Sequence, residues 1–181
     1  MRMRSLHTSA LAVTLAAFLG GCATYPPMPG VEQVDLDRFM GDWYVIASIP
    51  TPFEKDIYNA VETYERTAPK TVQTTFVFRK GGFDGERKEM KPVGYVKDDG
   101  SNALWGMQFI WPIKADYRIV YLDPDYSKTI IGRQKRDFVW IMTREPAIPE
   151  SEYAELVSVV ESLGYDVSKL RKVPQSWEDT P

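Results

Sequence analysis

The sequence predicts an all-β fold in which eight antiparallel strands form a barrel or a sandwich and one C-terminal α-helix packs outside them. Between residues 42 and 144, short segments rich in β-branched and aromatic residues recur at regular spacing with turn residues between them. Some of these segments alternate apolar and polar residues, and one later segment carries a helical apolar stripe. Eight strands before one helix favour an eight-stranded antiparallel up-and-down β-barrel, which has no free edge and can hold one small ligand. The order of the elements alone leaves a sandwich open.

The start of the chain predicts an export signal over residues 1–21. Arg2 and Arg4 precede an apolar stretch over residues 10–19, which is too short to span a bilayer. Small residues before Cys22 resemble the lipobox of bacterial lipoproteins, and this resemblance implies cleavage before Cys22 and attachment of lipid to it. The Ala after Cys22 resembles the pattern that directs such lipoproteins to the outer membrane.

Removal of the signal would leave a chain with unusual chemistry. His7 is the only histidine and Cys22 the only cysteine, so the mature chain would hold no imidazole and no free thiol. This excludes Ser-His-Asp and Cys-His catalysis and zinc sites built on His or Cys, whereas hydrolysis by carboxylates alone stays open. The formal net charge of -3 gives no support to nucleic-acid binding. We expect no cofactor and no metal.

A proline-rich stretch follows Cys22. It predicts a tether over residues 22–30 that spaces the lipid from the folded body, since such a stretch cannot enter a sheet interior. One domain is then expected over residues 31–176 and a polar tail over residues 177–181.

The strands are separated by turn signals such as Asp123-Pro124-Asp125. In the third strand, Val72, Thr74, Phe76 and Phe78 share one face. In the fourth, Pro92 predicts a bulge or an irregularity. The predicted strands are residues 43–48, 59–66, 71–80, 88–97, 103–111, 116–122, 127–134 and 137–144.

The helix is expected to begin near Pro149 and to end at Gly164. Glu150 and Glu152 suit the positive end of its dipole. A short strand is expected over residues 170–173. One apolar stripe, which is more typical of packing on a sheet than of a binding groove, comprises Tyr153, Leu156, Val157, Val160 and Leu163.

Three blocks in order carry a family resemblance. Gly41-Asp42-Trp43-Tyr44 resembles the GxW motif of lipocalins, Asp116-Tyr117 their second block, and Arg144 the arginine of their third. Residues 164–169 are similar to the segment after the helix in bacterial lipocalins and apolipoprotein D. The resemblance covers residues 31–175 and, with the lipobox, identifies the chain as similar to bacterial outer-membrane lipoprotein lipocalins.

The resemblance implies structural roles for Gly41, Trp43 and Arg144. Trp43 would plug the closed end of the barrel and Arg144 would lie across its ring, and neither would contact a ligand. Many lipocalins tie the C-terminal segment to the barrel with a disulfide. This chain, with one cysteine, cannot, so packing alone would hold its tail.

Side-chain parity then predicts the barrel interior. If Arg144 points inward, alternate residues before it do so too, whereas Val139 and Ile141 face out under the helix. Aromatic and methionine side chains of this kind either line a cavity for a long apolar ligand or fill a packed core. The predicted interior set is Tyr64, Phe76, Phe78, Trp105, Met107, Phe109, Phe138, Trp140 and Met142.

By resemblance, the ligand is a fatty acid such as palmitate or a lysophospholipid, and the protein stores or transports it at the periplasmic face of the outer membrane. Candidate charges for a headgroup at the mouth are Lys55, Arg79, Lys80 and Lys114.

Two alternatives to this reading stay open. An isomerase or esterase would need an inward carboxylate beside a polar partner, and Glu62 shares the parity of Tyr64. A purely structural protein would have a barrel packed solid. The sequence leaves the oligomeric state open.

Overall fold

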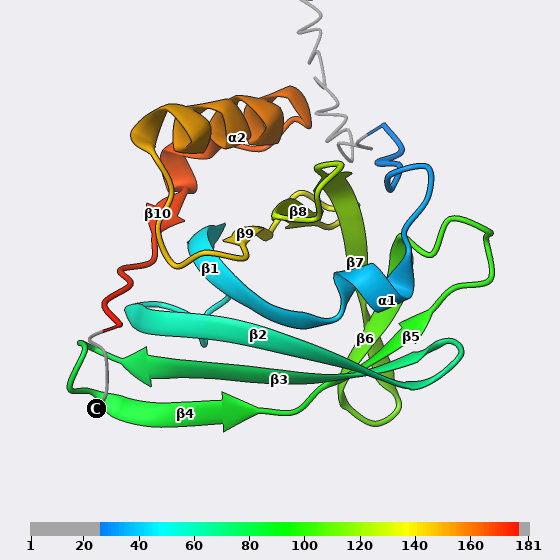
Figure 1. Ribbon diagram of the computed structural model, residues 1–181, viewed down its shortest axis with the longest axis horizontal. Helices are drawn as coiled ribbons and strands as arrows, with labels where there is room; N and C mark the ends of the chain where they lie inside the picture. Colours follow the sequence, from blue (N-terminus) through cyan, green and yellow to red (C-terminus); the bar gives the residue numbers. More distant parts are fainter. Residues whose placement is uncertain (1–25, 178–181) are drawn as a thin grey trace, which may run out of the picture.

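The computed structural model describes residues 26–177, so the predicted signal peptide and Cys22 lie outside the described residues. Figure 1 shows a curved sheet wrapped into a barrel with one long helix on its outside. No helix among the described residues is long and apolar enough to cross a bilayer.

The sheet closes on itself. Its strands pair antiparallel in the order β1-β2-β3-β5-β6-β7-β8-β9, and β9 pairs with β1 again. This closure confirms the predicted up-and-down barrel and rules out the sandwich. The strands are β1 (Gly41–Ile49), β2 (Ile57–Ala68), β3 (Thr71–Lys80), β4 (Glu86–Met90), β5 (Val93–Val96), β6 (Leu104–Ile110), β7 (Ile113–Leu122), β8 (Lys128–Gly132) and β9 (Val139–Thr143).

The fourth predicted strand is divided in two. Residues 88–97 were predicted as one strand with an irregularity at Pro92, and the structure has β4 and β5, which pair with successive halves of β3. Pro92 has no N–H to donate to the ladder, whereas its carbonyl oxygen accepts a hydrogen bond from the Thr74 N–H at 3.0 Å. Among the described strands, β4 pairs with β3 only, at the margin of the sheet (Figure 1).

A short helix for which the sequence carries no periodic signal closes one end of the barrel. In α1 (Leu36–Phe39), the Asp35 carboxylate caps the first turn by accepting from the N–H groups of Asp37 and Arg38. Phe39 is buried in the barrel end, with its ring centroid 5.1 Å from that of Trp43. Four residues are too few to show a helical period in the sequence.

Arg144 holds this closed end together. Its guanidinium carbon lies 3.8 Å from the centroid of the Trp43 ring. The same group donates hydrogen bonds to the carbonyl oxygens of Asp42 at 2.7 Å, Met40 at 2.8 Å and Arg38 at 2.9 Å. One side chain therefore provides hydrogen-bond donors for the backbone carbonyl groups at the end of α1 and the start of β1, and it also covers the Trp43 indole.

The long helix packs on the outer surface of the barrel beside β9 and β1 (Figure 1). Val139 and Ile141 of β9 face outward into a cluster with Leu156 and Val160 of α2 (Glu150–Ser162). The parity predicted for this strand is thereby confirmed.

The C-terminal segment is attached by hydrogen bonds without a disulfide. After η1 (Val167–Lys169), β10 (Arg171–Lys172) pairs with β1. The Gln175 side-chain amide then donates to the carbonyl oxygen of Val45 at 2.8 Å. The predicted short strand over residues 170–173 thus appears as a two-residue strand at the edge of β1.

Substitution of Arg144 tests this account of the closed end. We expect Arg144→Ala to lower the free energy of unfolding by about 3 kcal/mol, because charge-assisted hydrogen bonds and a cation–π contact are lost together. Arg144→Lys should lose about half as much, since lysine keeps the charge but not the planar fork. Urea unfolding measures both. The exposed Arg171→Ala serves as control, and a loss for Arg144→Ala no larger than in that control would contradict the assignment.

Candidate functional site

The end of the barrel opposite α1 is open and leads into a cavity. The cavity has a volume of about 600 Å³ and lies between the β1–β2 loop, β4, the β6–β7 hairpin and β9. Most of its wall is apolar, and the side chains that form it include Phe53, Phe109, Ile110, Phe138 and Trp140. We call it the mouth cavity.

A smaller cavity lies further inside the barrel. Its volume is about 30 Å³, close to the space of one water molecule, and Glu54, Phe109 and Trp140 line both cavities. Glu62 and Tyr117 contribute polar atoms to its wall. We call it the inner cavity.

Glu54 is a buried carboxyl group at the boundary between the two cavities. It is 7% exposed, and its Oε2 accepts hydrogen bonds from the Thr51 N–H at 3.1 Å and from the Trp140 indole N–H at 3.2 Å. Burial raises the pKa of this carboxyl, and the hydrogen bonds lower it in part. Glu54 thereby fixes the orientation of the Trp140 ring in the wall.

Glu62 is a second buried carboxyl group, and it belongs to a hydrogen-bonded chain. The Tyr64 hydroxyl donates to Glu62 and lies 2.6 Å from the Tyr117 hydroxyl. The pKa of Glu62 is raised to about 7, mainly because the carboxyl group is buried; the hydrogen bond from Tyr64 lowers the pKa in part, and the nearby charge of Glu54 adds to the increase. Burial likewise holds the pKa values of both tyrosines well above their ordinary range.

This polar group meets one condition of the enzyme alternative, since an inward carboxyl stands beside polar partners. The inner cavity beside Glu62, however, has room for about one water and none for a substrate. The Tyr64 hydroxyl is already hydrogen-bonded to both the Glu62 carboxyl and the Tyr117 hydroxyl. Within residues 26–177, no three acidic, histidine or cysteine side chains are placed to hold a metal ion.

Five of the nine predicted interior residues line the two cavities. Phe109, Phe138 and Trp140 lie in the wall of the mouth cavity. Phe76 and Met107 line the inner cavity, together with Phe109 and Trp140.

The other four pack in the core. The Phe78 ring lies 5.0 Å from that of Phe76, and Met142 is fully buried. Tyr64 and Trp105 lie in the aromatic layer above α1, with ring centroids 5.9 Å apart. Tyr64 and Trp105 form the floor beneath the cavities, whereas Phe78 packs beside Phe76 on the side of the open end. All four side chains take the packing role that the sequence left open.

The charges at the mouth differ from those that the sequence offered. Arg133 and Lys91 line the mouth cavity. The buried Arg133 Nε lies 3.4 Å from an Asp137 carboxylate oxygen and makes no hydrogen bond to any described residue. Arg133 and Lys91 stand outside the strands, so no alternation of apolar and polar residues could predict that they line the cavity. The prediction of mouth charges was wrong for this cavity, because its wall contains none of Lys55, Arg79, Lys80 and Lys114.

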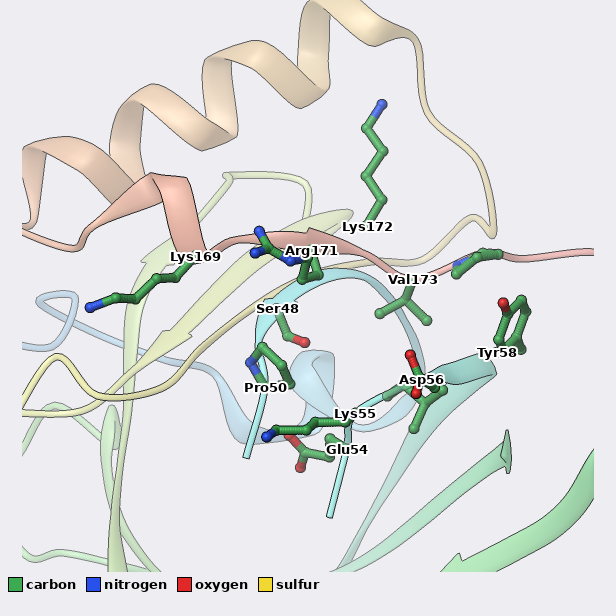
Figure 2. Close-up of a pocket in the computed structure, with 12 residues that line it drawn as sticks. Ser48, Pro50, Glu54, Lys55, Asp56, Tyr58, Lys169, Arg171, Lys172 and Val173 are labelled. Atoms are coloured by element: carbon green, nitrogen blue, oxygen red, sulfur yellow. The ribbon is translucent and has the colours of Figure 1, made fainter. Parts of the chain in front are cut away.

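A second hollow lies outside the barrel, beside β10, with a volume of about 460 Å³ (Figure 2). Several cations surround it, and Lys55 and Arg171 approach it from opposite sides (Figure 2). Lys172 pairs with Glu150 at 2.6 Å, however, and Arg171 donates to backbone carbonyl oxygens. Because the wall of this hollow is less apolar than that of the mouth cavity and two of its cations are already engaged, the mouth cavity is the stronger candidate site.

Comparison with known proteins agrees with the fold and the motif geometry. A family model described as a lipocalin-like domain matches residues 34–175. Temperature-induced lipocalin-1 of Arabidopsis thaliana is 35% identical, over 85% of each chain. The outer membrane lipoprotein Blc of Escherichia coli is 28% identical, over 91% of this chain and 94% of its own. Among solved structures, insecticyanin of Manduca sexta superposes with a TM-score of 0.66 at 15% identity, over 86% of this chain and 87% of its own.

The buried Glu62 predicts a pH-dependent stability. The folded state keeps the proton up to pH about 7, whereas the unfolded state releases it near 4.5, so folding takes up a proton between these values. Stability should therefore fall as pH rises through this window, by about 3 kcal/mol in all. Glu62→Gln should remove most of that slope in urea unfolding measured at several pH values.

The exposed Glu155→Gln on α2 is the matched control and should keep the wild-type slope. Equal slopes in Glu62→Gln and wild type would show that Glu62 is not the titrating group.

Proposed function

This chain belongs to the lipocalin family, and on that premise we propose that it binds a fatty acid or a lysophospholipid in the mouth cavity and stores or carries it. The observation that supports this most directly is a cavity of about 600 Å³ with a mainly apolar wall at the one open end of the barrel. An open volume of this size argues against a barrel packed solid.

The cavity also indicates how such a ligand would lie. An acyl chain gains about 0.8 kcal/mol for each methylene removed from water, so the apolar wall supplies affinity but discriminates chain length weakly. The buried carboxyl groups of Glu54 and Glu62 and the packed floor below them limit the depth of the chain. We expect an anionic headgroup to remain at the mouth and to pair with Arg133, which lines the cavity beside Asp137.

We further propose that the protein is anchored to the outer membrane, at its periplasmic face, through lipid on Cys22. Support comes from the lipobox-like sequence before Cys22 and from the Blc relatives, which are named outer membrane lipoproteins. A lipid carrier in this position would serve maintenance of the envelope under stress.

A variant that fills the mouth cavity tests ligand binding. Ala115 lines the mouth cavity, and we expect Ala115→Trp to weaken binding of a lysophospholipid at least tenfold by occupying the acyl site. The protein is the mature-length chain, residues 22–181, with Cys22→Ser. Native mass spectrometry and titration of tryptophan fluorescence measure the stoichiometry and the affinity.

Ala154→Trp, on an exposed turn of α2, is the matched control and should bind as wild type does. About one co-purified lipid per wild-type chain would identify the ligand class. A wild-type chain that carries no lipid and does not respond to lysophospholipid or fatty acid would refute the proposal.

The anchor is tested separately by Cys22→Ser in the full chain expressed in a bacterial host. Wild type should be recovered with outer-membrane fractions and show an intact mass increased by acyl groups, and the variant should lack that added mass. Identical masses for the two proteins, apart from the one side chain, would exclude lipidation at Cys22.

A further inference from the structure

We propose that the open end of the barrel docks on a lipid bilayer and that the tip of the β6–β7 hairpin inserts among the lipids. A ligand would then pass between the bilayer and the mouth cavity without crossing water. This goes beyond lipid binding and beyond a covalent anchor, because it assigns a membrane-contacting surface to the folded body itself.

The hairpin tip is the most exposed apolar part of the described chain. Ile110, Trp111 and Ile113 are 72%, 82% and 69% exposed, and residues 109–113 contain no charged side chain. Apolar side chains gathered in this way mark a contact surface, and tryptophan is the residue that most favours the bilayer interface. Pro112 also carries no backbone N–H that would need a partner in lipid.

The apolar tip is continuous with the interior of the barrel. Phe109 and Ile110 belong both to the hairpin and to the wall of the mouth cavity. Phe53, in the loop before β2, is 77% exposed and lines the same cavity. Apolar side chains therefore extend from the exposed rim into the cavity, which is the surface that a migrating acyl chain requires.

The N-terminal segment leads to the same end. Val31 donates to the carbonyl oxygen of Ile119 on β7, and Met28, further from α1, donates to the Gln134 side chain at 2.9 Å. The backbone N–H of Gln134 in turn donates to Asp116, which lines the mouth cavity. Followed backwards from α1, the chain thus runs along the barrel wall toward the open end.

The last described residue at this end, Pro26, accepts a hydrogen bond from Gln134. Met28 is 1% exposed, so this part of the expected tether lies on the barrel and not away from it. Cys22 stands four positions before Pro26, and four residues span at most about 14 Å. If Cys22 carries lipid, as proposed above, the anchor holds the open end close to the bilayer.

A second copy of the chain fits the tip less well than a bilayer does. Stable protein interfaces involve about 20–30 residues on each side, whereas the exposed apolar side chains here stand on one narrow hairpin and one loop. A bilayer accepts a narrow apolar projection because its surface adapts to it.

The test uses residues 22–181 with Cys22→Ser, so that no acyl chain contributes. We expect this protein to co-sediment with vesicles of phosphatidylethanolamine and phosphatidylglycerol. Brominated acyl chains should quench Trp111. The double variant Trp111→Ser, Ile113→Ser should bind vesicles at least tenfold more weakly. The matched control is Trp177→Ser, which removes an exposed tryptophan from the outer wall, where Trp177 contacts Tyr44.

Equal vesicle binding by wild type and the double variant would overturn the proposal. So would dimerisation through the tip, seen by analytical ultracentrifugation as a dimer that the double variant abolishes, in a protein that does not bind vesicles. Titration of lysophospholipid without vesicles separates this result from the proposed function. Neither Trp111 nor Ile113 lines the mouth cavity, so the double variant should keep wild-type ligand affinity.

Discussion

The guanidinium of Arg144 is the contact on which the rest of this molecule depends. It joins α1, the start of β1 and the end of β9 by hydrogen bonds while it lies over the Trp43 ring. A barrel needs one end blocked if its interior is to hold a ligand and not a channel. Because this group, together with Phe39 and Trp43, blocks one end, the cavities lie toward the opposite end.

From the blocked end outward, the interior changes in three steps. The first is a packed aromatic floor, in which the Trp105 and Tyr117 rings stack with centroids 5.4 Å apart. The second is a thin layer of buried hydrogen-bonding groups around Glu62 and Glu54. The third is the apolar mouth cavity. Buried polar groups between two apolar regions are costly unless they are paired. Because these groups are paired, the polar layer is stable and separates the mouth cavity from the aromatic floor.

The parts of this structure that repeat with a period were predictable, and the parts fixed by single contacts were not. Alternation along β3 and β9 gave the correct inward faces, and the helical stripe gave the correct side of α2. Glu54 was missed because its burial follows from the path of an irregular loop, and α1 was missed because one turn has no period. For the inward aromatic residues, parity places a side chain inside the barrel, but only packing decides whether space remains beside it.

The one-sided pairing of β4 has a consequence for motion. Its amides on the side away from β3 lack a strand partner among the described residues, whereas the strands around Trp43 are bonded on both sides. Local opening in proteins concentrates where backbone hydrogen bonds are fewest, and hydrogen exchange is fastest there. We therefore expect the closed end around Trp43 to be more rigid than β4 beside the mouth cavity. Local opening beside the mouth cavity, where Met90 of β4 lies in the wall, would leave the hydrogen bonds around Trp43 intact.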